Sequence, residues 1–211
     1  MTATVPHNGL RAIVTGAGDG VGFACAAALA ARGAELVLVD HHPEALTRVA
    51  EFLGAYSRFC DVLAETSADI FADAIEQEFG GFDVLVNAAG NGFVRTLGMM
   101  RMTKALLPLM RKGTGARLIV NIAPSRDPCP KHQLFPHAGS QSGFRTLSDA
   151  LAAQTRGSSI AVVAIEPAIR PTLSGSGFDR SVEDLAEAMV EIVRAQRPDW
   201  VMRPPPGLRR A

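Results

Sequence analysis

The stretch T-G-A-G-D-G-V-G at residues 15–22 constrains the fold more than any other part of the sequence. Residues 10–14 before it are mainly apolar and favour a buried strand, and the Ala-rich residues 21–31 after it favour a buried helix. Glycines between a strand and a helix allow a tight turn and a close backbone approach, and the helix N-terminus attracts a phosphate. This order of elements predicts a binding site for the pyrophosphate of a dinucleotide.

An acidic residue at the end of the next predicted strand agrees with such a site. Residues 34–39 (A-E-L-V-L-V) favour a buried strand, and Asp40 follows them directly. In dinucleotide-binding folds, a carboxylate roughly 20 residues after the glycines binds the ribose hydroxyl groups of the adenosine. The same carboxylate would repel a 2′-phosphate, which favours NAD(H) over NADP(H). The alternative interpretation is a helix-start turn followed by an exposed acid.

Strands and helices alternate along nearly the whole chain. Several predicted strands are continuous apolar runs, which is typical of a parallel sheet covered by helices on both faces. We therefore expect one α/β domain over residues 1–211, a Rossmann-type doubly wound sheet of about seven strands in the order 3-2-1-4-5-6-7. The further strands are expected at 55–60, 83–86, 116–123, 158–165 and 199–202, the helices at 43–53, 65–79, 96–111, 137–155 and 181–196, and a polar tail at 203–211.

Composition narrows the class of protein. The chain has 21 basic and 21 acidic residues, so no strong positive charge points to nucleic acid or to an anionic membrane surface. No apolar stretch approaches the roughly 18 residues of a membrane span, and residues 1–8 do not resemble a signal peptide. Cys25, Cys60 and Cys129 are widely spaced, so we expect reduced thiols in a cytoplasmic protein and neither disulfides nor a metal site.

Two motifs together resemble those of the short-chain dehydrogenase/reductase family. Thr15, Gly16, Gly20 and Gly22 match its T-G-x-x-x-G-x-G pattern, and Asn87-Ala88-Ala89-Gly90 matches the N-A/N-A-G pattern that follows the fourth strand. Residues 166–172 (E-P-A-I-R-P-T) are similar to its P-G-x-x-x-T segment. The resemblance covers essentially the whole chain and implies an oxidoreductase that binds NAD(H).

The resemblance also implies which residues contact the cofactor. Asp61 would approach the adenine amino group, although an acid that caps the following turn is an equal alternative. Thr172 would contact the nicotinamide carboxamide, with Ile169 beside the ring. Asp19 lies where relatives that prefer NADP often have a base, which again favours NAD. The predicted contacts are Thr15, Gly16, Gly18, Asp19, Gly20, Val21, Gly22, Asp40, Asp61, Val62, Asn87, Ala88, Ala89, Gly90, Gln141, Pro167, Ile169 and Thr172.

The catalytic positions of the family are replaced in this chain. Members use a Ser, a Tyr and a Lys, the last two in Y-x-x-x-K, supported by an Asn. The stretch H-A-G-S-Q at 137–141 resembles Y-x-A-S-K, so His137 stands at the Tyr position and Gln141 at the Lys position. Pro124 stands at the Ser position, followed by Ser125, and the place of the Asn falls near Arg95.

These replacements leave three interpretations of the function. The first is a nucleotide-binding protein, a pseudoenzyme candidate with weak or no ordinary carbonyl or alcohol redox activity. The second is an active NAD-dependent dehydrogenase or reductase in which His137 acts as acid or base, Ser125 donates to the substrate oxygen and Gln141 binds ribose hydroxyls. The third is a non-catalytic subunit that assembles with a complete relative.

The resemblance also bears on assembly and on the substrate. Relatives pair through the helices that correspond to residues 96–111 and 137–155, so we expect a homodimer or homotetramer. The stretch between Thr172 and Ser181, where relatives often have a loop over the substrate, is short and rich in Gly and Ser. It predicts a poor lid, and the substrate is not identified.

Overall fold

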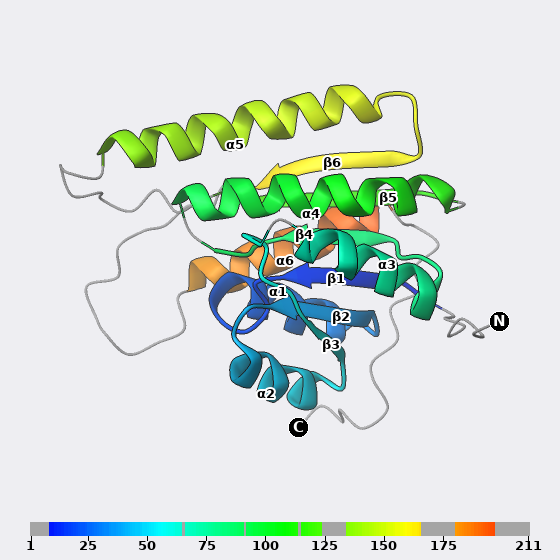
Figure 1. Ribbon diagram of the computed structural model, residues 1–211. Helices are drawn as coiled ribbons and strands as arrows, with labels where there is room; N and C mark the ends of the chain where they lie inside the picture. The colour runs from blue at the N-terminus through cyan, green and yellow to red at the C-terminus, as the bar shows by residue number, and fades with distance from the viewer. Residues whose placement is uncertain are drawn as a thin grey trace.

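Parallel strands form one sheet at the centre of the molecule (Figure 1). The computed structural model describes residues 9–64, 66–90, 92–113, 115–123, 134–165 and 180–196, with only the backbone of 92–93, 134–138, 180–183 and 185. In the described part the sheet has the order β3-β2-β1-β4-β5-β6, which confirms the predicted doubly wound fold. The strand predicted at 199–202 and the tail at 203–211 lie outside the described residues. The strands are β1 (Arg11–Thr15), β2 (Glu35–Asp40), β3 (Tyr56–Phe59), β4 (Val84–Asn87), β5 (Arg117–Ile122) and β6 (Ile160–Ile165).

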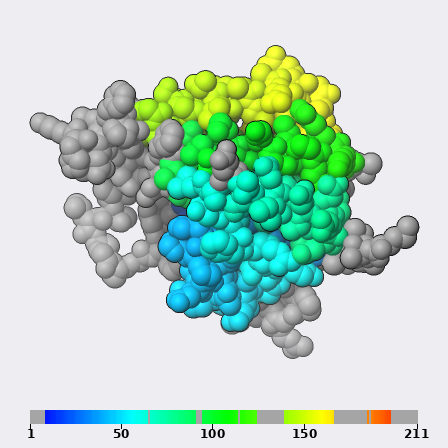
Figure 2. Space-filling view, viewed as in Figure 1, coloured from blue at the N-terminus to red at the C-terminus, as the bar shows by residue number. Residues whose placement is uncertain are grey.

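Helices cover both faces of this sheet. One layer holds α1 (Gly20–Ala30), α2 (Pro43–Leu53) and α6 (Arg180–Gln196), and the other holds α3 (Ser67–Phe79), α4 (Gly92–Lys112) and α5 (Leu134–Thr155). Alternate side chains of a strand point to opposite faces. Val14 accordingly packs in the first layer and Ile13 in the second. Figure 2 shows the face that the second layer covers.

The helix boundaries follow local sequence signals where these are strong. The predicted bounds of α2 are confirmed, because Pro43 suits the first turn and Gly54 adopts the left-handed conformation (φ 63°) that ends it. Two helices begin earlier than expected, α4 at Gly92 rather than residue 96 and α5 at Leu134 rather than residue 137. Pro136 is compatible with the first turn of α5, since backbone N–H groups there have no intrahelical acceptor.

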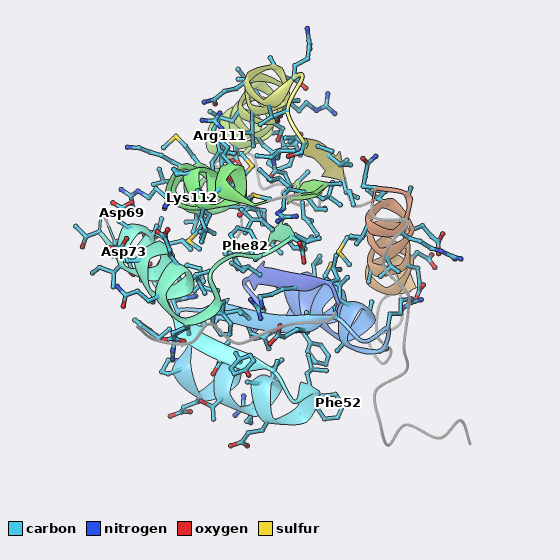
Figure 3. The ribbon with its side chains drawn as sticks, turned by 90° about the vertical axis from the view of Figure 1, so that its right-hand side faces the viewer. Phe52, Asp69, Asp73, Phe82, Arg111 and Lys112 are labelled. Atoms are coloured by element: carbon cyan, nitrogen blue, oxygen red, sulfur yellow. The ribbon has the colours of Figure 1, made fainter. Side chains whose placement is uncertain are left out.

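Buried ion pairs lie at the amino ends of the strands. The fully buried Arg11 pairs with Glu35 at 2.7 Å and donates a hydrogen bond to the Phe79 carbonyl at 2.8 Å. Arg117 pairs with Asp83 at 3.1 Å. Figure 3 views the molecule from this end, with Phe82 in the interior and Phe52 at the outside. In parallel α/β sheets ligands bind at the opposite, carboxyl ends of the strands, so these pairs lie away from the expected site.

Candidate nucleotide-binding site

The glycine-rich turn between β1 and α1 packs closely against the segment after β4. Gly16 has a φ of +67°, and a Cβ atom there would lie 2.6 Å from the Ala89 Cα atom. A Cβ atom at Gly22 would lie 1.9 Å from the Gly16 carbonyl oxygen. No side chain fits at either position without moving backbone. The two glycines therefore let three backbone segments meet at the carboxyl end of β1.

Gly20 has a different environment, because a Cβ atom there would have no atom within 4 Å. Gly20, Val21 and Gly22 form the first turn of α1, whose N–H groups have no intrahelical acceptor, and the Asp19 side chain makes no capping hydrogen bond. The N-terminus of α1 thus presents backbone donors and the positive end of the helix dipole to open space. This is the arrangement that binds a phosphate.

Thr15 holds the turn in place through side-chain hydrogen bonds. Its buried Oγ1 atom accepts hydrogen bonds from the backbone N–H groups of Ala88 at 3.1 Å and Ala89 at 3.2 Å. These bonds join the end of β1 to the segment that follows β4. Thr15 holds the wall of the site in place and does not line it.

Asp40 lies at the carboxyl end of β2 and is 7% exposed. Its Oδ2 atom accepts a hydrogen bond from the Gly18 N–H at 3.0 Å, and its Oδ1 atom accepts one from the His42 N–H at 2.9 Å. The Nδ1 atom of the exposed His41 lies 3.2 Å from Oδ1. A carboxylate can accept about four hydrogen bonds, so acceptor capacity remains for the two hydroxyl groups of a ribose.

A cavity of about 640 Å³ opens beside these groups. This volume falls within the range of small-molecule sites. Of the predicted contacts, the following line it: Gly16, Asp19, Gly20, Val21, Gly22, Asp40, Asp61, Val62, Ala88, Ala89 and Gly90. The Oδ1 atom of Asp61 also accepts a hydrogen bond from the Leu63 N–H at 2.9 Å, so this carboxylate closes the turn after β3 while it faces the cavity.

Asn87 does not line the cavity. Its buried Nδ2 group donates to Thr103 Oγ1 at 3.0 Å and to Asn121 Oδ1 at 2.9 Å. The Nδ2 group of Asn121 in turn donates to Ser148 Oγ at 3.2 Å. This hydrogen-bond chain joins β4, β5, α4 and α5 beneath the site. Asn87 therefore acts on the site by holding these elements together.

The predicted catalytic groups are placed only in part. His137 lies in the first turns of α5, where the structure gives its backbone alone, and Gln141 is half-buried on the same helix and does not line the cavity. Thr96 on α4 donates a hydrogen bond to the Ser140 carbonyl at 3.2 Å, so this part of α5 lies against the start of α4. Ser125, Pro167, Ile169 and Thr172 lie outside the described residues.

Arg95 lines the cavity, although sequence reasoning considered it only as the place of a missing Asn. Its Nε–H group donates to the Gly90 carbonyl at 2.7 Å and its Nη1 group to the Ala123 carbonyl at 3.0 Å. Burial lowers the pKa of the guanidinium. Burial also raises the pKa of the Cys25 thiol on α1 to about 12, and the charge of Arg95 opposes this rise in part. The sequence offered no signal for this position, because the helix was expected to begin at residue 96, after Arg95.

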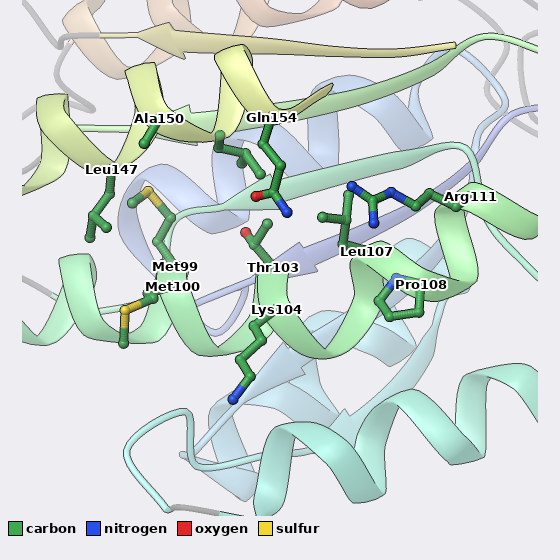
Figure 4. A pocket seen from close by; sticks show the side chains of 11 residues that line it. Met99, Met100, Thr103, Lys104, Leu107, Pro108, Arg111, Leu147, Ala150 and Gln154 are labelled. Carbon is green, nitrogen blue, oxygen red and sulfur yellow. The ribbon is translucent and has the colours of Figure 1, made fainter. Parts of the chain in front are cut away.

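A second cavity, of about 390 Å³, lies between α4 and α5 (Figure 4). Met99, Leu107 and Leu147 give it a mainly apolar wall, and Lys104 and Arg111 add positive charges. It lies on the helices that the resemblance assigns to subunit pairing.

Three further observations concern only the part of the chain that the structure describes. Cys25 and Cys60 are buried free thiols, and Cys129 lies outside this part. No group of three or more His, Cys, Asp or Glu side chains is arranged to hold a metal ion. None of the helices is both long and apolar enough to cross a membrane.

Comparison with known proteins gives consistent matches. The family model for short chain dehydrogenase matches residues 11–97. The D-threitol dehydrogenase of Mycolicibacterium smegmatis is 30% identical over 217 residues, covering 92% of this chain and 83% of that protein. The 3-ketoacyl-(acyl-carrier-protein) reductase of Brucella melitensis, solved with NADH, has a TM-score of 0.73 and 28% identity over 87% of this chain and 90% of its own. A metagenomic short-chain oxidoreductase solved with NADP has a TM-score of 0.73 at 23% identity, over 87% of this chain and 89% of its own.

Proposed function

The chain belongs to the short-chain dehydrogenase/reductase family, and from this premise we propose that it binds NAD(H) and has weak or no ordinary carbonyl or alcohol redox activity. The observation that carries the proposal is the Asp40 carboxylate, which the Gly18 N–H holds beside the phosphate-binding turn at 3.0 Å. The cavity therefore combines a hydrogen-bond acceptor for the ribose hydroxyl groups with a site for a phosphate. The parallel sheet, with strands from residue 11 to residue 165, supports treating residues 1–211 as one domain.

The described residues fit the cofactor. Asp40 would accept hydrogen bonds from the hydroxyl groups of the adenosine ribose. The pyrophosphate would lie in the open space at Gly20, at the N-terminus of α1. NAD(H) would supply a hydride acceptor or donor when bound. Ala88, Ala89 and Gly90 are small enough to let the backbone after β4 approach it.

The charges around the adenosine end support a preference for NAD over NADP. Asp19, Asp40 and Asp61 all line the cavity. A 2′-phosphate beside Asp40 would meet a buried negative charge, and like charges repel more strongly where water is excluded. Solved relatives of this fold include complexes with NADH and with NADP, so the preference rests on these carboxylates.

Proton transfer is the step that the residues of this site support least. In this chain Gln141 would hydrogen-bond ribose hydroxyls but carries no charge to lower the pKa of a neighbouring acid. General acid–base catalysis contributes about 10² to 10⁴-fold, so its loss would leave a slow enzyme. The rival proposal is an active dehydrogenase that uses His137 and Ser125, with a step in its pH–rate profile near the ordinary pKa of histidine, about 6.5.

Two experiments test the proposal. Titration by NADH fluorescence should show binding that is tighter for NADH than for NADPH, and tighter NADPH binding or no binding of either would remove the cofactor proposal. An NADH-oxidation screen over ketones and aldehydes should show little turnover. Robust wild-type turnover that collapses in His137→Ala would instead support the active enzyme, whereas activity that emerges only in His137→Tyr/Gln141→Lys would support the pseudoenzyme.

For assembly we propose a homodimer or homotetramer that pairs through α4 and α5. The apolar wall between these helices, which includes the 43% exposed Met100, supports this. A monomeric mass in light scattering at micromolar concentration would contradict it, and a mass that rises only on mixing with a complete relative would favour the non-catalytic subunit. The cytoplasmic location stays a prediction.

A further inference from the structure

A tight turn brings α4 directly over the carboxyl ends of two strands. Gly90 has a φ of +73°, and a Cβ atom there would lie 2.6 Å from the Val94 Cγ1 atom. Because α4 begins at Gly92, its first turn follows β4 almost at once (Figure 1). This places Arg95 where it donates to Gly90, just after β4, and to Ala123, just after β5. Two backbone carbonyls thus anchor the guanidinium at the wall of the cavity.

The remaining N–H groups of this guanidinium have no protein acceptor among the described residues, and no described carboxylate pairs with it. An arginine has five N–H donors, of which the Gly90 and Ala123 carbonyls occupy two. Burial disfavours the charged form, as the lowered pKa of Arg95 indicates. Buried charges in proteins are usually paired. Arg95 is half-buried, so an anion in the cavity would offset part of this desolvation cost.

The position of Arg95 points to one part of a nucleotide. The strand order places Asp40 on one side of β1 and the anchors of Arg95, after β4 and β5, on the other. The N-terminus of α1 lies between, and Arg95 is near enough to α1 for its charge to act on Cys25. Among the described residues that line the cavity, Arg95 has the only permanently positive side chain, and three carboxylates line the same cavity.

We propose that Arg95 binds the diphosphate of the dinucleotide from the side opposite Asp40. This inference rests on the proposed cofactor function. The two charges of a diphosphate suit the planar guanidinium fork, which can form parallel hydrogen bonds to phosphate oxygens. The backbone donors of α1 and the guanidinium would then hold the same group from two sides.

Calorimetric titration with ADP-ribose and with adenosine tests this role. Arg95→Gln should weaken ADP-ribose binding about 10- to 100-fold, the range of a charge-assisted hydrogen bond, and leave adenosine binding unchanged. Arg95→Lys, which keeps the charge but loses the fork, should fall between. Arg111→Gln is the matched control, since it removes the same charge from an exposed position on the same helix and should bind both ligands as the wild type does.

Several outcomes separate the inference from the proposed function. Wild-type protein that binds neither ligand would overturn both. Unchanged ADP-ribose affinity in Arg95→Gln would overturn the role of Arg95 alone. An equal loss of affinity for adenosine would do the same, because it indicates a change in the shape of the cavity. If Arg95→Gln does not fold, the wild type decides: its affinity for ADP-ribose, and not for adenosine, should fall as salt rises. A salt-independent affinity for ADP-ribose would overturn the inference.

Discussion

Alanine at two glycines of the same turn should affect stability in one order and ligand binding in the reverse order. Both Gly16 (φ +67°) and Gly20 (φ +49°) are left-handed, so alanine at either position carries a conformational cost of about 1–2 kcal/mol. At Gly16 the new Cβ atom would also lie 2.6 Å from the Ala89 Cα atom, and such overpacking adds about 1–3 kcal/mol. At Gly20 the methyl group enters open space. We therefore expect Gly16→Ala to lose about 2–5 kcal/mol of stability and Gly20→Ala only about 1–2 kcal/mol.

Ligand binding should show the reverse order once folding is accounted for. The open space at Gly20 is where the pyrophosphate is proposed to lie, so a methyl group there would compete with the ligand. Urea denaturation followed by circular dichroism gives the free energy of unfolding of each variant, and NADH fluorescence at a temperature where both are folded gives the dissociation constant. Gly20→Ala should bind NADH at least tenfold more weakly than the wild type, an estimate of roughly 1.4 kcal/mol for steric exclusion.

Either of two results would contradict these expectations for Gly20→Ala. If Gly20→Ala binds NADH as the wild type does, the phosphate does not lie at the N-terminus of α1. If Gly20→Ala is as unstable as Gly16→Ala, the space beside Gly20 is not open. Either result would remove the steric basis for assigning this turn to the cofactor.

Two further predictions concern single charges. Asp40→Asn keeps the shape of the side chain but removes the charge that opposes a 2′-phosphate. The preference for NADH over NADPH should therefore fall about tenfold in paired fluorescence titrations. An unchanged ratio of the two dissociation constants would contradict the role of Asp40. Burial raises the pKa of Cys25 to about 12, so the folded protein keeps the thiol proton that the unfolded chain loses above about pH 8.5. Stability should therefore fall with rising pH, by about 2 kcal/mol between pH 8 and pH 10 beyond the change in Cys25→Ala. Urea denaturation under reducing conditions measures this, and equal slopes for the two proteins would contradict it.

The sequence predicted best those features that depend on position along a strand. Asp40 lies at the end of β2 and beside the cavity, as a strand end predicts, because the carboxyl ends of parallel strands meet at one edge of the sheet. Its contact with a ribose stays a prediction. The pattern of α2 was also sufficient, since Pro43 and Gly54 mark its ends. These signals are local, and tertiary contacts do not override them.

The features that the sequence did not predict depend on direction and on tertiary packing. Asn87 shares the face of Leu85, toward α3 and α4, so strand alternation could have shown that its side chain points away from the glycine-rich turn. The start of α4 at Gly92 has no such signal, because glycine at a helix start is a weak marker and the turn at Gly90 imposes the boundary. The position of Arg95 on the cavity wall follows from that turn, and so it could not be read from periodicity.

The turn at Gly90 makes the electrostatic potential of the cavity depend on loop length. Each residue added to a helix advances the rest by about 1.5 Å and rotates it by about 100°. One residue inserted in the first turn of α4, ahead of Arg95, would swing the guanidinium away from the Gly90 and Ala123 carbonyls while the composition of the wall stayed the same. The acidic residues at the other end would then dominate the potential. An insertion or deletion at this junction would therefore change which ligand charge the cavity prefers, without any substitution in the cavity.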